Sequence, residues 1–193
     1  MKRDLQERIR FFRSFLANPR RVGAVLPTSR WAVQDMLDMA NLSQARHVAE
    51  LGAGTGAYTG EILKRLQPDA RFLAFEIDPD LAAVISERFN DPRLQVINDS
   101  VENIADYLDG AKVDVAVSAI PFTSLPEDAK QNIFRAVAKV LASEGVMVQI
   151  QYSTVMQEEL TQRFASVRRR LSPLNVTPAF LYACRVPRLQ EAS

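Results

Sequence analysis

The run Val48-Ala49-Glu50-Leu51-Gly52-Ala53-Gly54-Thr55-Gly56 says more about the architecture of this chain than any other part of it. It reads as a short buried strand that breaks into a glycine turn, and we expect residues 57–66 to follow as a helix. Glycines let the backbone turn tightly and approach a ligand, and a helix start presents free N–H groups. This order predicts a nucleotide-binding loop rather than a turn that binds nothing. The expected cofactor contacts in it are Glu50, Gly52, Ala53, Gly54, Thr55 and Gly56.

Two nucleotide cofactors fit such a loop. Gly52, Gly54 and Ala57 also satisfy the dinucleotide pattern G-x-G-x-x-G/A, with Glu76 near the spacing of its ribose-binding acid. Glu50, however, lies beside the glycine turn, where a carboxylate favours an ammonium or sulfonium ligand and repels a pyrophosphate. The sign of this charge favours S-adenosylmethionine over NAD. A NAD-dependent dehydrogenase ranks last, because the sequence shows no evident Tyr-x-x-x-Lys pair and no second substrate domain.

The composition is that of one folded domain with an uneven charge. The 193 residues are 47% hydrophobic and 24% charged, which is typical of a globular chain with a full core. The formal net charge is +1. Residues 1–21 hold seven basic and two acidic residues, so they carry +5 and leave −4 for the remainder. A basic arm on a mildly acidic body indicates an anionic partner such as a membrane or a nucleic acid.

Several site classes and locations are disfavoured by the sequence. The single cysteine, Cys184, excludes an internal disulfide and reads as a buried structural thiol. The single histidine, His47, has no second histidine nearby, so we expect no metal site. We find no signal peptide and no apolar stretch long enough to span a bilayer. The expected location is the cytoplasm, with peripheral association at the inner face of the cytoplasmic membrane.

Beyond the glycine loop, strands and helices alternate as a parallel α/β sheet requires. Strands are expected at 71–78, 94–99, 113–118, 146–152 and 179–186, and helices at 79–89, 127–141 and 156–168. Pro79 suits the first turn of its helix. The sequence therefore predicts one doubly wound, Rossmann-like domain over residues 31–193, preceded by an N-terminal segment over residues 1–30.

Polar residues fall where the first four strands end, and ligands of such sheets bind at the carboxyl ends of the strands. The residues concerned are Glu50, Glu76, Asp99 and Ser118. Glu76 is expected to accept both ribose hydroxyls, and Asp99 to accept from the adenine amine. We assign Ile77, Ser100 and Ser118 to the same cofactor-binding set. Any one acid could instead be a helix cap or turn residue, but the four in order favour a cofactor site.

The loop Ser118-Ala119-Ile120-Pro121-Phe122 resembles the Asn/Asp-Pro-Pro-aromatic loop of amino-methylating enzymes. In that loop, backbone carbonyls and the polar side chain hold the amine that receives the methyl group. The candidate catalytic residues are therefore Ser118, Ile120, Pro121 and Phe122, with Tyr152 as a possible hydrogen-bond partner or base. The alternative is a proline-containing loop that places Phe122 in the core.

The N-terminal segment has the pattern of a membrane-interface helix. Leu5, Ile9, Phe12 and Leu16 repeat at helical spacing among arginines. The expected membrane or phosphate contacts are Lys2, Arg3, Arg8, Arg10, Phe12, Arg13, Phe15, Arg20, Arg21, Arg168, Arg169 and Arg170. A helix packed on the domain itself and an RNA-binding helix are the alternatives. The triple arginine also reads as a solvated helix end that complements the helix dipole.

The stretch from Asn18 to Ser29, followed by the Glu-Leu-Gly-x-Gly-Thr-Gly loop, resembles the bacterial phospholipid N-methyltransferases of class I. Further matches are the 75–79 segment, the Ser-x-x-Pro loop, Gln151-Tyr152 and Asn175-x-x-Pro178-Ala179. The resemblance implies a Rossmann-like fold, S-adenosylmethionine as donor and S-adenosylhomocysteine as product. It also adds Thr28 and Ser29, in a segment that covers the cofactor, to the binding set. Glycine and leucine are common in that family at Ala119 and Ile120, which leaves the acceptor and the number of methylations open.

The function expected from these features is stepwise methylation of the head-group amine of phosphatidylethanolamine, toward phosphatidylcholine. The partners implied are the phospholipid substrate and an anionic membrane surface, with no nucleic acid and no obligate protein partner. An RNA adenine-N6 methyltransferase of the rRNA dimethylase type is the first alternative. It is disfavoured by the absent helical RNA-binding domain and by Ser118 in place of an asparagine. A non-catalytic, cofactor-binding membrane adaptor is the second.

Overall fold

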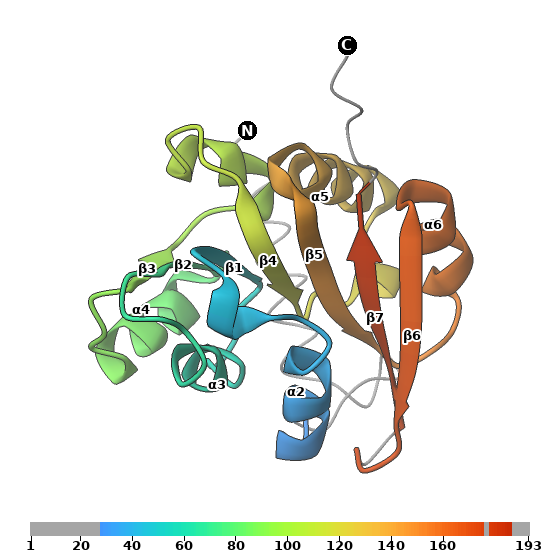
Figure 1. The fold of residues 1–193 in the computed structure, drawn as a ribbon, viewed down its shortest axis with the longest axis horizontal. Helices are drawn as coiled ribbons and strands as arrows, with labels where there is room; N and C mark the ends of the chain where they lie inside the picture. Colours follow the sequence, from blue (N-terminus) through green and yellow to red (C-terminus); the bar gives the residue numbers. More distant parts are fainter. Residues whose placement is uncertain (1–27, 176–177, 187–193) are drawn as a thin grey trace.

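A computed structural model of the chain describes residues 28–175 and 178–186. The predicted N-terminal amphipathic helix, with its basic and aromatic residues from Lys2 to Arg21, lies outside the described residues. The helix labels in Figure 1 begin at α2. None of the helices in the described part of the chain is long and apolar enough to cross a membrane.

The described chain forms a seven-stranded sheet in the order β3-β2-β1-β4-β5-β7-β6. The strands are β1 (His47–Leu51), β2 (Arg71–Phe75), β3 (Leu94–Ile97), β4 (Val113–Ser118), β5 (Leu141–Gln151), β6 (Ser166–Ser172) and β7 (Ala179–Arg185). The pairs among β1 to β5 are parallel, and β7 runs antiparallel to both β5 and β6. The order turns back at β1, so the sheet has its switch point between β1 and β4, where ligands of this architecture bind. The predicted doubly wound α/β fold is confirmed.

Helices cover both faces of the sheet (Figure 1). The α-helices are α2 (Arg30–Leu37), α3 (Thr59–Leu63), α4 (Pro79–Arg88), α5 (Glu127–Val140) and α6 (Met156–Arg163). Short 3-10 turns are η1 (Leu42–Gln44), η2 (Val101–Tyr107) and η3 (Phe122–Ser124). Side chains of α2, α3 and α4 join one core cluster, and those of η2, α5 and α6 join the other. Two layers of helices around a sheet thus bury the apolar strands on both faces.

Local sequence signals explain where the helices begin. Pro79 opens α4 as predicted, and the Asp78 carboxylate before it accepts a hydrogen bond from the Asp80 backbone N–H at 2.9 Å. Ser29 caps α2 in the same way through the Ala32 N–H at 3.2 Å. Cys184 is buried in β7, and burial raises the pKa of its thiol to about 12, which agrees with the predicted structural role.

One predicted element is wrong. The expected helix over 156–168 ends at Arg163, and Ser166–Ser172 form the edge strand β6, so Arg168, Arg169 and Arg170 do not end a helix. Their side chains alternate across a strand that has only one neighbour, and an edge position tolerates charge on both faces. Other elements differ in length: α3 is shorter than the predicted 57–66 helix, β2 and β3 end before residues 78 and 99, and β5 begins before residue 146.

Candidate cofactor and acceptor site

The glycine loop follows β1 and joins it to α3. Gly52, Gly54 and Gly56 have φ values of +75°, +57° and +79°, a region that residues with a side chain rarely adopt. A Cβ added to Gly54 would meet nothing within 4 Å, so its backbone borders open space. A Cβ on Gly56 would lie 2.7 Å from the Phe89 ring, so this glycine lets α4 pack against the loop. Ala53 is buried and Thr55 is exposed.

Glu76, directly after β2, holds this loop in place. It is buried, and its Oε2 accepts from the Gly54 N–H at 2.7 Å while Oε1 accepts from the Asp78 N–H at 2.9 Å. Burial raises the pKa of this carboxyl, and the two N–H donors partly oppose that shift. The Ile77 carbonyl beside it accepts from the Asn98 amide. Glu76 therefore lies at the glycine loop, and its role as a ribose-binding acid stays a prediction.

Glu50 lies inside the site, one residue before the end of β1. Its Oε2 accepts from the Thr59 hydroxyl at 2.6 Å, whereas Oε1 is buried and finds no partner among the described residues. Burial raises the pKa of Glu50 to about 8, and the nearby Glu76 charge adds to the shift. The Tyr58 hydroxyl is also buried without a partner in the described part of the chain. A buried carboxyl oxygen without a donor favours a cationic ligand group beside it.

Asp99 is engaged by the turn that follows β3. Its carboxylate accepts from the Asn103 amide, from the Tyr107 hydroxyl at 2.8 Å and from the Ser100 N–H at 2.7 Å. Ser100 in turn caps η2 through the Glu102 N–H. Asp99 thus orders the start of η2 at the carboxyl edge of the sheet, and its contact with an adenine amine stays a prediction.

Residues 28 and 29 are fastened to this same edge. The Thr28 and Tyr152 hydroxyls lie 3.3 Å apart, and the Ser29 N–H donates to the Asn175 side-chain oxygen at 2.8 Å. Tyr152 follows β5, and Asn175 lies in the turn between β6 and β7. Burial raises the pKa of Tyr152, so its hydroxyl keeps its proton at neutral pH. The segment predicted to cover the cofactor therefore enters the domain beside the strand ends.

The loop after β4 packs directly against the glycine loop. A Cβ on Gly52 would lie 3.1 Å from Cγ1 of Ile120. The Ile120 N–H donates to Ser118 Oγ at 3.3 Å, and the Ile120 carbonyl accepts from both Gln151 Nε2 at 3.2 Å and the Phe122 N–H at 2.9 Å. Both lone pairs of that carbonyl are used, so it fixes the loop's shape. The predicted cofactor loop and the predicted acceptor loop are brought into contact.

The aromatic of this loop points inward. Phe122 is 1% exposed and stacks on Phe134 of α5, with ring centroids 4.5 Å apart. Pro121 precedes η3, in which Phe122 is the first residue. This placement corresponds to the alternative in which Phe122 belongs to the core, and its packing anchors the loop.

Two buried polar residues beneath the loop were not singled out from the sequence. Gln149 on β5 pairs in register with Ser118 on one side and Tyr182 of β7 on the other. All three are fully buried, and neither the Gln149 amide nor the Tyr182 hydroxyl finds a partner among the described residues. Burial also raises the pKa of Tyr182. A polar row thus runs from the acceptor loop into the sheet on the α5 and α6 side.

The three arginines of β6 lie at the far edge of the sheet. Arg170 forms an ion pair with Asp35 of α2 at 2.8 Å, and Arg169 contacts Gln157 and lies over the Phe180 ring. All three are exposed. Within residues 28–175 and 178–186, no group of three or more His, Cys, Asp or Glu side chains is placed to hold a metal ion.

Comparison with known proteins agrees with this geometry. The family described as "Methyltransferase domain" matches residues 48–145, from β1 into β5. The chain belongs to the class I S-adenosylmethionine-dependent methyltransferases. It is 33% identical to an ornithine lipid N-methyltransferase of Singulisphaera acidiphila over 91% of this chain and 94% of that protein. It is also 38% identical to the ribosomal RNA small subunit methyltransferase H of Polynucleobacter necessarius, but over only 32% of this chain and 19% of that protein.

Solved structures of methyltransferases share the fold. An O-methyltransferase from Thermotoga maritima superposes with a TM-score of 0.65 at 14% identity, covering 90% of this chain and 72% of that one. The N-methyltransferase NodS of Bradyrhizobium japonicum, solved with S-adenosylhomocysteine, gives 0.61 at 13% identity, covering 82% and 89%. At these identities the likeness shows the fold alone.

The methyl donor of this methyltransferase is S-adenosylmethionine. The residues present fit that cofactor. Open space borders Gly54, the unpaired Glu50 oxygen suits a positive charge, and Glu76 lies at the loop with a carboxylate that can accept hydroxyl hydrogens. Gly52, Gly54, Glu50 and Glu76 would hold it.

Proposed function

We propose that this methyltransferase transfers methyl groups from S-adenosylmethionine to the head-group amine of a membrane lipid, working at the membrane surface. The observation that supports this most directly is the contact between Gly52 and Ile120. An amine held at the 118–122 loop would lie next to the loop that binds the methyl donor. Since the methyl group passes in line to a nitrogen lone pair, positioning supplies much of the catalysis.

The hydrogen bonds within the 118–122 loop indicate which of its polar groups remain available to hold the amine. The Ile120 carbonyl is already used twice, whereas Ser118 Oγ accepts only from the Ile120 N–H in the described part of the chain. Ser118 therefore keeps a hydroxyl proton and a lone pair for the acceptor. Gln151 acts through the Ile120 carbonyl and is a positioning residue.

The amine reaches this loop as a neutral molecule. An alkyl ammonium of the lysine type has a pKa of about 10.4, so it must lose a proton before its nitrogen can attack. Tyr152 holds its own proton, because burial raises its pKa, and it bonds with Thr28 instead of acting as a base. Ser118, Gln149 and Gln151 are uncharged and buried, so they favour the neutral amine over the ammonium. The proton is released to solvent as the amine enters.

Two lipid classes are the candidates for the acceptor. The relative from Singulisphaera is named for ornithine lipid, and the phospholipid family resembled by the sequence acts on phosphatidylethanolamine. Both molecules present a primary alkyl amine on a polar head group. RNA methylation is the weaker interpretation, because the alignment with the rRNA methyltransferase of Polynucleobacter necessarius covers only 32% of the length of this chain.

The test is methyl transfer from radiolabelled S-adenosylmethionine to three acceptors in parallel: phosphatidylethanolamine vesicles, ornithine lipid vesicles and bulk RNA. We expect label in an organic-extractable lipid, with chromatography counting the methyl groups. Glu76→Ala is the negative control, because it removes the acceptor of the Gly54 N–H. Label in RNA alone would overturn the proposal.

A further inference from the structure

Large apolar side chains are exposed at one end of the sheet. Of the five exposed in the described residues, three belong to α2 and to the end of β6 with its following turn. Trp31 is 48% exposed, Leu171 52% and Leu174 65%. The helix α2 and the turn between β6 and β7 both lie at the lower end of the molecule in Figure 1.

Polar contacts fix α2 against this turn. The Ser29 N–H, at the start of α2, donates to the Asn175 side chain at 2.8 Å. One turn after Trp31, Asp35 accepts from the Ser172 hydroxyl at 2.6 Å and pairs with Arg170 at 2.8 Å. Trp31 therefore lies between one contact to this turn and a second pair of contacts to strand β6. We call the resulting surface the α2–turn surface; it is formed by Arg30, Trp31, Arg168, Arg170 and Leu174, and is bordered at the end of β6 by Leu171, whose side chain lies on the opposite face of the strand together with that of Arg169.

The charge on this surface has one dominant sign. The three arginines and the neighbouring Asp35 give a net charge of +2, and Arg169 adds a further positive charge on the other face of β6. Arg30 lies over the Trp31 ring, with its guanidinium carbon 4.8 Å from the ring centroid. Basic groups beside exposed tryptophan and leucine suit the boundary between anionic head groups and acyl chains. A nucleic acid would use the arginines but would leave the leucines in water.

We propose that the α2–turn surface docks on the surface of an anionic lipid bilayer, with Trp31, Leu171 and Leu174 entering the head-group region. The occupant is a membrane, and the arginines supply the charge complementarity. Each arginine near such a surface strengthens partitioning by about fivefold.

The position of residues 28 and 29 also supports a membrane as the binding partner of this surface. Thr28 and Ser29 are fastened at this edge by Tyr152 and Asn175, so the preceding 27 residues join the domain beside the α2–turn surface. Residues 1–21 carry a net charge of +5 by sequence. The sign of that charge is the same as on the α2–turn surface, as an anionic bilayer would favour. The inference rests on the proposed function in one respect, since this surface lies beside the proposed acceptor site.

Vesicle sedimentation of the full chain tests the surface. The probes are vesicles of phosphatidylcholine with and without phosphatidylglycerol. For Trp31→Ser/Leu171→Ser/Leu174→Ser we expect partitioning to anionic vesicles to fall by about thirtyfold, because apolar area no longer inserts. Val84→Ser is the matched control, since Val84 on α4 is also 48% exposed. Leu174→Asp alone, in the turn, serves if the triple variant folds poorly.

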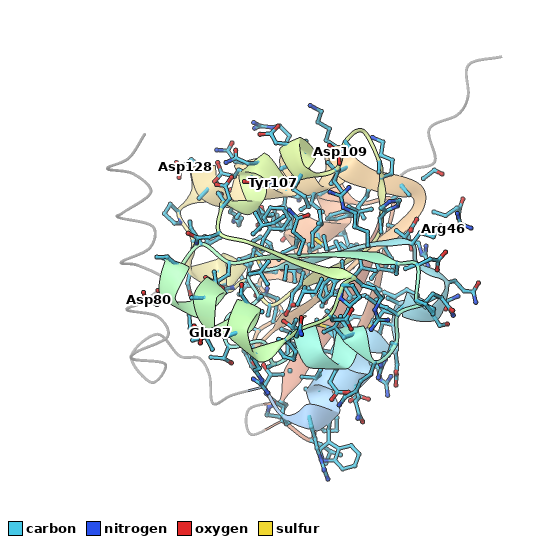
Figure 2. All side chains as sticks on the ribbon, turned by 90° about the vertical axis from the view of Figure 1, so that its left-hand side faces the viewer. Arg46, Asp80, Glu87, Tyr107, Asp109 and Asp128 are labelled. Atoms are coloured by element: carbon cyan, nitrogen blue, oxygen red, sulfur yellow. The ribbon has the colours of Figure 1, made fainter. Side chains whose placement is uncertain are left out.

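A second pair of variants tests the charge. Arg30→Gln/Arg168→Gln should lower binding to anionic vesicles by about twentyfold. Arg46→Gln/Lys139→Gln is the matched control, because both residues lie near the opposite, amino edge of the sheet; Arg46 stands on the surface in Figure 2. Thermal midpoint and cofactor affinity, measured on every variant, verify folding.

The outcomes separate this inference from the proposed function. Loss of vesicle binding in the surface variants, with the control variants unchanged, supports the docking surface even if no lipid accepts a methyl group. Surface variants that bind vesicles like the unmodified chain overturn it, even if detergent-dispersed lipid is methylated. Variants that lose affinity for bulk RNA but keep vesicle binding overturn it as well.

Discussion

The two halves of the proposed site differ in their electrostatics. On the cofactor side, burial raises the pKa of two carboxyls, Glu50 and Glu76, and the Glu76 charge adds to the shift at Glu50. On the acceptor side, the buried polar groups are uncharged: Ser118, Gln149, Gln151 and Tyr182. The first arrangement suits a ligand that brings a positive charge. The second suits a neutral amine and rejects its ammonium form.

Each half therefore contains buried groups that lower the stability of the protein when no ligand is bound. The cofactor side holds acids whose ionised form is unfavourable until a cation arrives. The acceptor side holds the Gln149 amide and the Tyr182 hydroxyl, which have no hydrogen-bond partner within the described chain. Substitutions that relieve each kind of cost should therefore stabilise the protein and impair one binding step only.

The largest expected effect is at Glu50. Its pKa of about 8 in the folded state lies above the usual 4.5, so between those pH values the folded protein binds a proton that the unfolded chain has lost. Stability should therefore fall as pH rises from about 4.5 to about 8. Glu50→Gln should raise the free energy of unfolding at pH 8 by roughly 2–5 kcal/mol, with little change near pH 4.5.

Chemical unfolding of the cofactor-free protein across this pH range gives the measurement. Glu87→Gln, on the exposed face of α4 (Figure 2), is the control and should leave the pH profile unchanged. Parallel pH profiles for Glu50→Gln and the unmodified chain would show that burial does not hold Glu50 in its protonated form. Calorimetry should also show weaker S-adenosylmethionine binding by Glu50→Gln.

A smaller effect is expected where the two halves touch. Gly52→Ala places a side chain at φ +75° and pushes on Ile120, whereas Gly110→Ala meets a similar φ of +82° with nothing within 4 Å. Both should lose about 1–2 kcal/mol of stability from backbone strain. Only Gly52→Ala should also slow methyl transfer, by roughly tenfold to a hundredfold, because it shifts the acceptor loop. Equal activity in the two variants would mean that the loop contact does not position the amine.

The acceptor side offers a test at Gln149. Because its buried amide is unpaired within the described chain, Gln149→Leu should stabilise the protein by about 1–2 kcal/mol. If the amide meets the acceptor, methyl transfer should fall at the same time while cofactor affinity holds. Thermal unfolding and initial rates on the same preparation give both numbers. A stabilised variant of full activity would make Gln149 a structural residue alone.

The cofactor half could be predicted from the sequence because it is local. The glycine loop, Glu50 and the Pro79 start of α4 follow from neighbouring residues and backbone preferences. Gln149 and Tyr182 could not be found this way, because their meeting depends on the register of two antiparallel strands. Strand β6 was missed because its three arginines look like a helix end, and only the pairing of the whole segment with β7 shows that it is a strand. The sequence pattern predicts Phe122 as a contact of the acceptor, whereas in the structure its ring stacks on Phe134 of α5, which is distant in the sequence.

The smallest expected effect separates two glutamines that lie on the same strand, two residues apart. Gln151 differs from Gln149 in having a partner, since it donates to the Ile120 carbonyl. Gln151→Leu should therefore destabilise the protein by about 1 kcal/mol, opposite in sign to Gln149→Leu. Because the acceptor loop loses one restraint, kcat should fall about fivefold with S-adenosylmethionine affinity unchanged, and Gln151→Glu should not restore it, because a carboxylate cannot donate to a carbonyl. If both leucine variants shift stability in the same direction, the pairing of Gln151 with Ile120 does not distinguish the two positions, and the acceptor loop is held by Phe122 packing instead.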